Sequence, residues 1–163
     1  MGWGAVMAYP GNCREEVMVK SPTSMSAVLC ACVLAATAAG ADPASDVSAA
    51  YSAWDAAFNA GDAKAVAALY GPDAIFLPAT HDVIKGPQGI EEFFGGLFGM
   101  GVTGHKLELI EAEGDEDLLF GTAKWSANGK DAQGADQPWA GVATHVFERQ
   151  EDGSLKLRVH TFN

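Results

Sequence analysis

The stretch from Trp54 to Phe94, WDAAFNAGDAKAVAALYGPDAIFLPATHDVIKGPQGIEEFF, contains an ordered series of structural signals. Its aromatic and alanine-rich beginning predicts a helix that stops at Gly61, because glycine readily adopts the left-handed conformation of a helix end. Asp62 follows at once, and an aspartate in that position can cap the next helix. The pattern therefore predicts two successive helices, the second over residues 63–70.

The second half of the same stretch changes from helix to strand and back. A turn at Gly71-Pro72-Asp73 leads into a short predicted strand over residues 74–77, and a polar loop follows Pro78. Gly86-Pro87 then opens a third helix, since proline is favoured in the first helical turn. The apolar stripe of that helix indicates core packing and consists of Ile90, Phe93, Phe94, Leu97 and Phe98.

Beyond the third helix the apolar residues alternate, which is typical of strands. Four β segments are predicted, over residues 105–113, 118–126, 139–149 and 155–162. The polar, glycine-bearing segment 128–137 is expected to form a mobile hairpin loop. One sheet and three helices then make a single small α+β domain, in which a strongly curved antiparallel sheet wraps around the helices.

The order of helix, NAGD, helix, LY..DA, strand, KG..GI and helix resembles the SnoaL-like and ketosteroid-isomerase-like branch of the nuclear transport factor 2-like superfamily. The resemblance covers nearly all of the chain after residue 45. It implies a cone-shaped, cystatin-like roll with a pocket between the sheet and the helices. It implies little about the reaction, because one fold hosts many unrelated sites.

Residues 1–41 are expected to lie outside the single SnoaL-like domain, which is assigned to 42–163. The apolar run 27–39 followed by Ala39-Gly40-Ala41 is typical of a bacterial secretory signal, which predicts a periplasmic or secreted protein beginning near Asp42. A membrane anchor is the alternative, but the run is shorter than the roughly 20 residues that span a bilayer. Two further alternatives stay open: translation starting at Met18, and a lipoprotein attached at Cys32.

Cysteine content and charge exclude several classes of function. Cys13, Cys30 and Cys32 all precede Asp42, so the predicted mature chain has no disulfide and no thiolate metal site. The four charged residues of the removed segment cancel, and the mature domain keeps the net charge of −11. Such a charge repels nucleic acid and anionic membranes, so neither is an expected partner.

The apparent motifs for cofactors and metals lack the sequence context that such sites require. The GMGVTG segment at 99–104 matches a dinucleotide-binding pattern, but it follows a helix and precedes a strand, which is the reverse of the required order. The histidines are not at metal-binding spacing, and the acidic segment 115–117 lacks the alternating pattern of a calcium loop. The sequence therefore predicts neither a metal nor a cofactor.

Alternation and the resemblance together indicate which side chains line the pocket. The resemblance turns inward the strand face that carries His145 and Phe147. On the last strand a single alternation places Arg158, His160 and Phe162 on the inward face, and Leu155, Leu157 and Val159 on the outer face. The outer-face residues, with Thr144 and Val146, predict a homodimer that forms through the sheet.

The catalytic residues of the steroid isomerases are not present in this sequence. Those enzymes use an aspartate base and an oxyanion hole made by a tyrosine and a protonated aspartic acid. The corresponding positions hold Pro78, Trp54 and His145. Uncharacterised SnoaL-like proteins commonly have aspartate and tryptophan where this chain has His160 and Phe162. Steroid isomerisation by that route is therefore not expected.

Two functions remain open. The first is an exported, non-catalytic domain whose apolar pocket binds a small hydrophobic molecule, with or without a carbonyl group, or which only dimerises through its sheet. The second is a cofactor-independent isomerase, dehydratase or cyclase in which His145 and His160 act as acid and base, because imidazole can exchange a proton near neutral pH. The residues expected to shape the site are Trp54, Tyr70, Trp125, Phe147, Arg158 and Phe162. The alternative for each histidine is a hydrogen bond within a half-buried strand.

Overall fold

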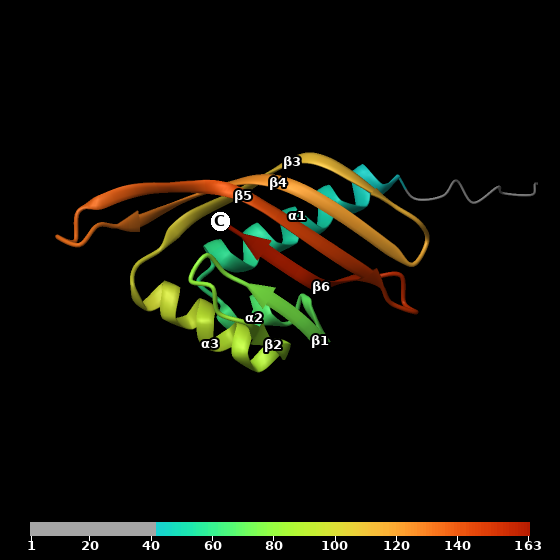
Figure 1. Cartoon of the computed structure of the whole chain (residues 1–163), viewed down its shortest axis with the longest axis horizontal. Coiled ribbons are helices and arrows are strands. Elements are labelled where there is room, and N and C mark those ends of the chain that lie inside the picture. The colour runs from blue at the N-terminus through green and yellow to red at the C-terminus, as the bar shows by residue number, and fades with distance from the viewer. Residues whose placement is uncertain (1–41) are drawn as a thin grey trace, which may run out of the picture. The chain divides into compact units, whose positions relative to one another are not determined.

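The computed structural model describes residues 42–163, in which three helices lie against one curved six-stranded sheet (Figure 1). The helices are α1 (Pro43–Asn59), α2 (Ala63–Ala67) and α3 (Gly86–Gly99). The strands are β1 (Tyr70–Leu77), β2 (Ile84–Lys85), β3 (Thr103–Gly114), β4 (Leu118–Lys130), β5 (Asp136–Arg149) and β6 (Leu155–Phe162). The predicted α+β class with a strongly curved sheet is confirmed.

The spatial order of the strands is β2-β1-β6-β5-β4-β3. Neighbouring strands pair antiparallel except β1 and β6, which run parallel with Phe76 opposite His160. The sheet is therefore mixed, whereas the alternation alone predicts an antiparallel one. A parallel pair needs a long connection, and here the whole chain between β1 and β6 supplies it. Figure 1 shows β3, β4 and β5 arching over α1.

The helix ends in the first half follow the sequence signals. Gly61 has φ +68°, and the Asp62 side chain accepts a hydrogen bond from the Ala65 backbone N–H at 2.8 Å. The second helix is shorter than predicted, because it ends at Ala67 and Tyr70 already begins β1. This difference moves the Tyr70 side chain from a helix surface into the core of the sheet.

The β4–β5 hairpin is longer and more regular than predicted. Pairing continues from Leu118 opposite Glu148 to Lys130 opposite Asp136, so the connecting turn covers only 131–135. The prediction of a loop beginning at Asn128 is wrong for both flanks of the turn. Asn128 and Gly129 are poor strand formers, but each pairs across the hairpin with a residue of β5.

The core lies between the sheet and the three helices. One stripe of α1 is buried at Val47, Tyr51, Trp54 and Phe58, as the spacing i, i+4, i+7, i+11 predicts. The helix approaches β4 closely at Gly121, where an added Cβ would lie 2.6 Å from the Tyr51 hydroxyl oxygen and from Val47. Glycine at this position thus sets the depth at which α1 enters the sheet.

The predicted signal segment lies outside the described residues, and its role stays a prediction. Within 42–163, no helix combines the length and the apolar character needed to cross a membrane.

Candidate functional site

Three histidines from three different strands meet in one pocket. His105 lies at the start of β3, His145 in β5 and His160 in β6, and all three line a cavity of about 80 Å³. His145 and His160 are 2% and 4% exposed, and they are direct partners across the two strands. We call this cavity the histidine pocket. Its other walls are apolar or aromatic and include Trp54, Phe58, Phe94, Leu97, Trp125, Trp139 and Phe162.

Two tyrosine hydroxyl groups lie within hydrogen-bond distance of His145 and His160, the two central histidines of the pocket. The Tyr51 hydroxyl lies 2.9 Å from Nδ1 of His145, and the Tyr70 hydroxyl lies 2.7 Å from Nδ1 of His160. Trp54 Nε1 donates a hydrogen bond to the Tyr70 hydroxyl oxygen at 3.2 Å. Burial raises the pKa of both tyrosines above their ordinary range, so both phenols stay protonated.

Both central histidines are neutral at pH 7. Burial lowers the pKa of His145 to about 3, assisted by repulsion from His105 and opposed by a hydrogen bond with the backbone of Gly121. Burial also holds the pKa of His160 well below its ordinary value, and repulsion from His145 and His105 acts in the same direction. Neither residue can be a cation in the folded protein near neutral pH.

His105 is held by α1 through two side chains one turn apart. Its Nδ1 lies 2.7 Å from Oδ1 of Asp55, whose other oxygen accepts from the Leu107 backbone N–H at 2.9 Å. Asn59 bonds both to the backbone N–H and to the backbone carbonyl of His105, each at 2.8 Å. A carboxylate at Nδ1 fixes the imidazole so that Nε2 of the neutral ring is an acceptor.

The sequence patterns do not predict the Asp55–His105 pair. They give Asp55 no role, and they place His105 only by its spacing to the other histidines. A signal was present: Asp55 and Asn59 are polar residues at i and i+4 beside an apolar helix stripe, and such a face can hold a neighbouring strand. Which strand it holds depends on the tertiary fold.

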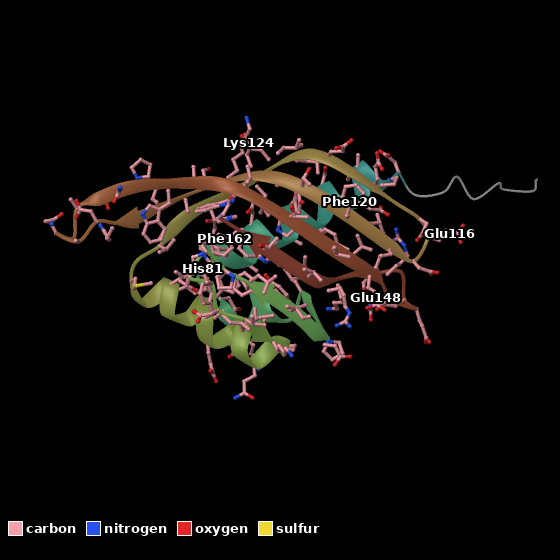
Figure 2. All side chains as sticks on the ribbon, viewed as in Figure 1. His81, Glu116, Phe120, Lys124, Glu148 and Phe162 are labelled. Atoms are coloured by element: carbon pink, nitrogen blue, oxygen red, sulfur yellow. The ribbon has the colours of Figure 1, made fainter. Side chains whose placement is uncertain are left out.

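The remaining predicted site residues fall into two groups. Trp54, Trp125 and Phe162 line the histidine pocket, and Figure 2 shows Phe162 on the opposite side of the sheet from Lys124. Tyr70 lies behind His160 and bonds to it but does not reach the pocket surface. Phe147 lines a different pocket, described below.

Arg158 lines neither pocket, because the last strand contains a bulge. Val146 pairs with Val159, but the next residue, Phe147, pairs with Leu157, so Arg158 is an extra residue in β6. Its guanidinium donates to the backbone carbonyl of Asp73. The single alternation predicted for this strand is therefore wrong. His160 and Leu157 both face the helices, although they are three residues apart.

A second pocket of about 290 Å³ lies between the first half of α1 and the ends of β5 and β6. We call it the side pocket. Tyr51 lines it, whereas Trp54 and His145 line both pockets and form the wall between them. The Asp46–Arg149 ion pair stands among its lining residues, which are otherwise mostly apolar. It is the larger cavity, but only the histidine pocket collects the titratable side chains from several strands.

No metal site is formed by the residues that the structure describes: no group of three or more histidine, cysteine, aspartate or glutamate side chains has metal-binding geometry. The three histidines of the pocket instead bond to tyrosine or aspartate through Nδ1.

Comparison with known proteins agrees with this architecture. A ketosteroid isomerase-like protein from Erwinia carotovora has a TM-score of 0.65 and 21% identity, with 72% of this chain and 92% of that chain covered. An NTF2-like protein with a cystatin-like fold from Novosphingobium aromaticivorans has a TM-score of 0.62 and 14% identity, with 74% of this chain and 80% of that chain covered. An NTF2-like superfamily protein from Salmonella enterica has a TM-score of 0.62 and 13% identity, with 73% of this chain and 88% of that chain covered.

These identities are low, so the structural likeness establishes the fold alone. No protein of curated function matches the sequence. Residues 51–157, however, match the SnoaL-like domain family, and this segment contains every helix and strand of the fold except the first half of α1 and the larger part of β6. The chain therefore belongs to the SnoaL-like domain family and has the nuclear transport factor 2-like fold.

Proposed function

We propose that the histidine pocket binds a small, largely apolar molecule. The observation that carries this proposal is the convergence of His105, His145 and His160 in a cavity whose other walls are aromatic or aliphatic. A few polar atoms that fix orientation inside an apolar cavity are the usual composition of a small-molecule site. Neutral imidazoles suit an uncharged ligand, and the net charge of −11 disfavours an anionic one.

The size of the cavity limits how the ligand is held. A volume of about 80 Å³ equals that of roughly three water molecules in the liquid, at ~30 Å³ each. Only the polar end of a ligand fits beside the histidines. The half-buried Trp125, Trp139 and Phe162 would contact the remainder, and their large apolar surfaces supply most of the affinity.

A thermal-shift screen of neutral fragments on the full chain tests this proposal. A specific ligand raises the unfolding midpoint by mass action. The pocket-filling variant Ala127→Leu should abolish the shift, because Ala127 is a buried lining residue. Ser126→Leu is the matched control, since Ser126 is exposed on the same strand. Hits that bind equally to parent and Ala127→Leu would place the site elsewhere and contradict the proposal.

Acid–base catalysis is the second candidate, and the Asp55–His105 hydrogen bond favours it. The carboxylate leaves Nε2 of neutral His105 as an acceptor in the pocket, which is the arrangement of a general base. The role of general base therefore moves from His145 and His160 to His105. The pKa values of His145 and His160 are low, which makes them weak proton acceptors. Isomerisation, dehydration and cyclisation without cofactor all begin with such a proton transfer.

Replacing the Asp55 carboxylate tests for catalysis separately from ligand binding. The side-chain amide of Asp55→Asn can donate to Nδ1 of His105, which would move the ring proton to Nε2 and remove the base. If the protein is an enzyme, turnover of a ligand found by the screen should fall by about 10²-fold or more with little change in affinity. Unchanged turnover would exclude His105 as the base.

We also propose that the domain is exported, on the basis of the Ala39-Gly40-Ala41 sequence and the apolar run before it. Mass spectrometry of the protein from fractionated bacterial cells should find an N-terminus at or near Asp42 outside the cytoplasm. A cytoplasmic chain that still carries Cys30 and Cys32 would contradict export.

A further inference from the structure

Trp54, Tyr70 and His160 form a buried chain of hydrogen bonds. Trp54 Nε1 lies 3.2 Å from the Tyr70 hydroxyl oxygen, which lies 2.7 Å from Nδ1 of His160. The three residues come from α1, β1 and β6, and each is 3% to 4% exposed. Solvent therefore cannot replace a partner that is missing from this chain.

The direction of each bond follows from the protons available. Indole Nε1 can only donate, so the Tyr70 oxygen accepts from Trp54. The Tyr70 O–H then has one acceptor among the described residues, Nδ1 of His160. If Nδ1 carried the proton instead, the Tyr70 O–H would be a buried donor without an acceptor. That arrangement is unfavourable, because an unsatisfied buried donor keeps its full desolvation cost.

His160 consequently carries its single proton on Nε2. Within residues 42–163, Nε2 of His160 has no hydrogen-bond partner. Every fully buried side-chain nitrogen or oxygen of these residues has such a partner, so Nε2 is not fully buried. It must therefore contact open space. His160 lines the histidine pocket and not the side pocket, so the N–H faces the histidine pocket.

We propose that Trp54 and Tyr70 are positioning residues that fix His160 as a neutral N–H donor, and that the pocket thereby selects an uncharged molecule with a carbonyl oxygen. This inference rests on the proposed function and names its ligand class. No lysine or arginine is among the residues that line the pocket, so no permanent cation there compensates a carboxylate. A ketone, aldehyde, ester or lactone supplies an uncharged acceptor, which the Nε2–H requires.

Imidazole ¹⁵N spectra of the full chain at pH 7.5 test the assignment of the proton directly. We expect His160 to show a protonated Nε2 and an unprotonated Nδ1. Tyr70→Phe removes the only donor to Nδ1, so the two nitrogens should shift toward a mixture of tautomers. Tyr51→Phe is the matched control, because Tyr51 bonds to His145, and it should leave the His160 signals unchanged.

The spectrum of the parent protein decides the matter even if Tyr70→Phe does not fold. A proton on Nδ1 of His160 in the parent would overturn the proposal. Equal changes at His160 in Tyr51→Phe and Tyr70→Phe would also overturn it, since the effect would then be a general loosening of the core.

Binding of two isosteric probes tests the ligand class. Cyclopentanone and methylenecyclopentane have nearly the same shape, but only the ketone has an acceptor oxygen. We expect the ketone to bind about threefold to tenfold more tightly, the ratio that one hydrogen bond gives. Tyr70→Phe should reduce this preference and Tyr51→Phe should keep it.

The outcomes separate this inference from the function on which it rests. If both probes bind equally well, the pocket is a ligand site but selection for a carbonyl is wrong. If neither probe nor any fragment binds, the proposed function is wrong, and the carbonyl selection falls with it.

Discussion

The imidazole rings of His145 and His160 lie beside each other across β5 and β6, with their centroids 4.4 Å apart and their planes inclined by 35°. Two protonated rings at this separation would repel each other in a site that water hardly reaches. The arrangement is stable only while both rings are neutral, and it makes the fold sensitive to acid.

Acid should therefore destabilise the protein through these two histidines. Their pKa in the folded state lies below the ordinary value of 6.5, and that of His145 falls to about 3. The unfolded chain thus binds more protons below pH 6.5, so the free energy of unfolding falls as the pH decreases from about 6.5 toward 3. The slope is at most about 1.4 kcal/mol per pH unit for each histidine.

Urea denaturation between pH 7.5 and 5.5 measures this effect before most carboxylates titrate. His160→Gln should reduce the slope of unfolding free energy against pH, whatever it does to stability at pH 7.5. The exposed His81 provides the control, and His81→Gln should leave the slope unchanged. A parent protein equally stable at both pH values would contradict the neutral, buried assignment.

Asp55 should contribute to stability as well as to the site. Its two oxygens join α1 to β3 through His105 and the Leu107 backbone N–H. Asp55→Ala leaves that backbone donor without its partner, and we expect the free energy of unfolding to decrease by about 2 kcal/mol. Asp55→Asn keeps one acceptor oxygen and should lose less. Equal stabilities of Asp55→Ala and the parent would show that water replaces both bonds.

The predictability of this fold depended on whether a feature is local. The end of α1 at Gly61 and the cap at Asp62 are specified by neighbouring residues, and the sequence predicted both. The bulge at Arg158 is not local, because it results from the register that β5 imposes on β6. Strict alternation predicts the inward positions of His160 and Phe162 correctly, but it misplaces Leu157, the residue immediately before the bulge.

The site shows the same division between local and tertiary information. His145 and Phe147 share a face because consecutive residues of a strand alternate, but Phe147 lies beyond the wall that His145 forms and lines the side pocket. The Asp55–His105 pair joins residues 50 positions apart. No periodicity of either segment specifies that contact, since it arises only when β3 docks against α1.

Filling the side pocket should stabilise the protein. Ala50 is a half-buried residue of α1 that lines this cavity of about 290 Å³. Ala50→Leu would bury additional methyl groups there, and cavity filling commonly adds about 1 kcal/mol to the free energy of unfolding. Ala56→Leu on the exposed face of the same helix corrects for helix propensity. A lower stability of Ala50→Leu than of this control would mean that the walls cannot accept the larger side chain.

Homodimer formation through the outer face of the sheet remains a proposal, with a different set of residues. Leu157 is 3% exposed and belongs to the core, and Leu155 packs against the core and lines the side pocket, so neither can contribute. A cross-strand row of Phe120, Val146 and Val159 replaces them, as pairing places these residues side by side on β4, β5 and β6. Exposed apolar residues extend the surface on both sides and include Ile110, Leu118 and Val142.

A charge placed in that row should break the dimer. In a two-fold interface Phe120→Glu would bring two like charges close together, so light scattering at micromolar concentration should give twice the chain mass for the parent and the single chain mass for the variant. Val83→Glu is the matched control, because Val83 is 63% exposed and lies outside the sheet. A parent that is monomeric, or a Phe120→Glu variant that remains dimeric, would show that this face is not the interface.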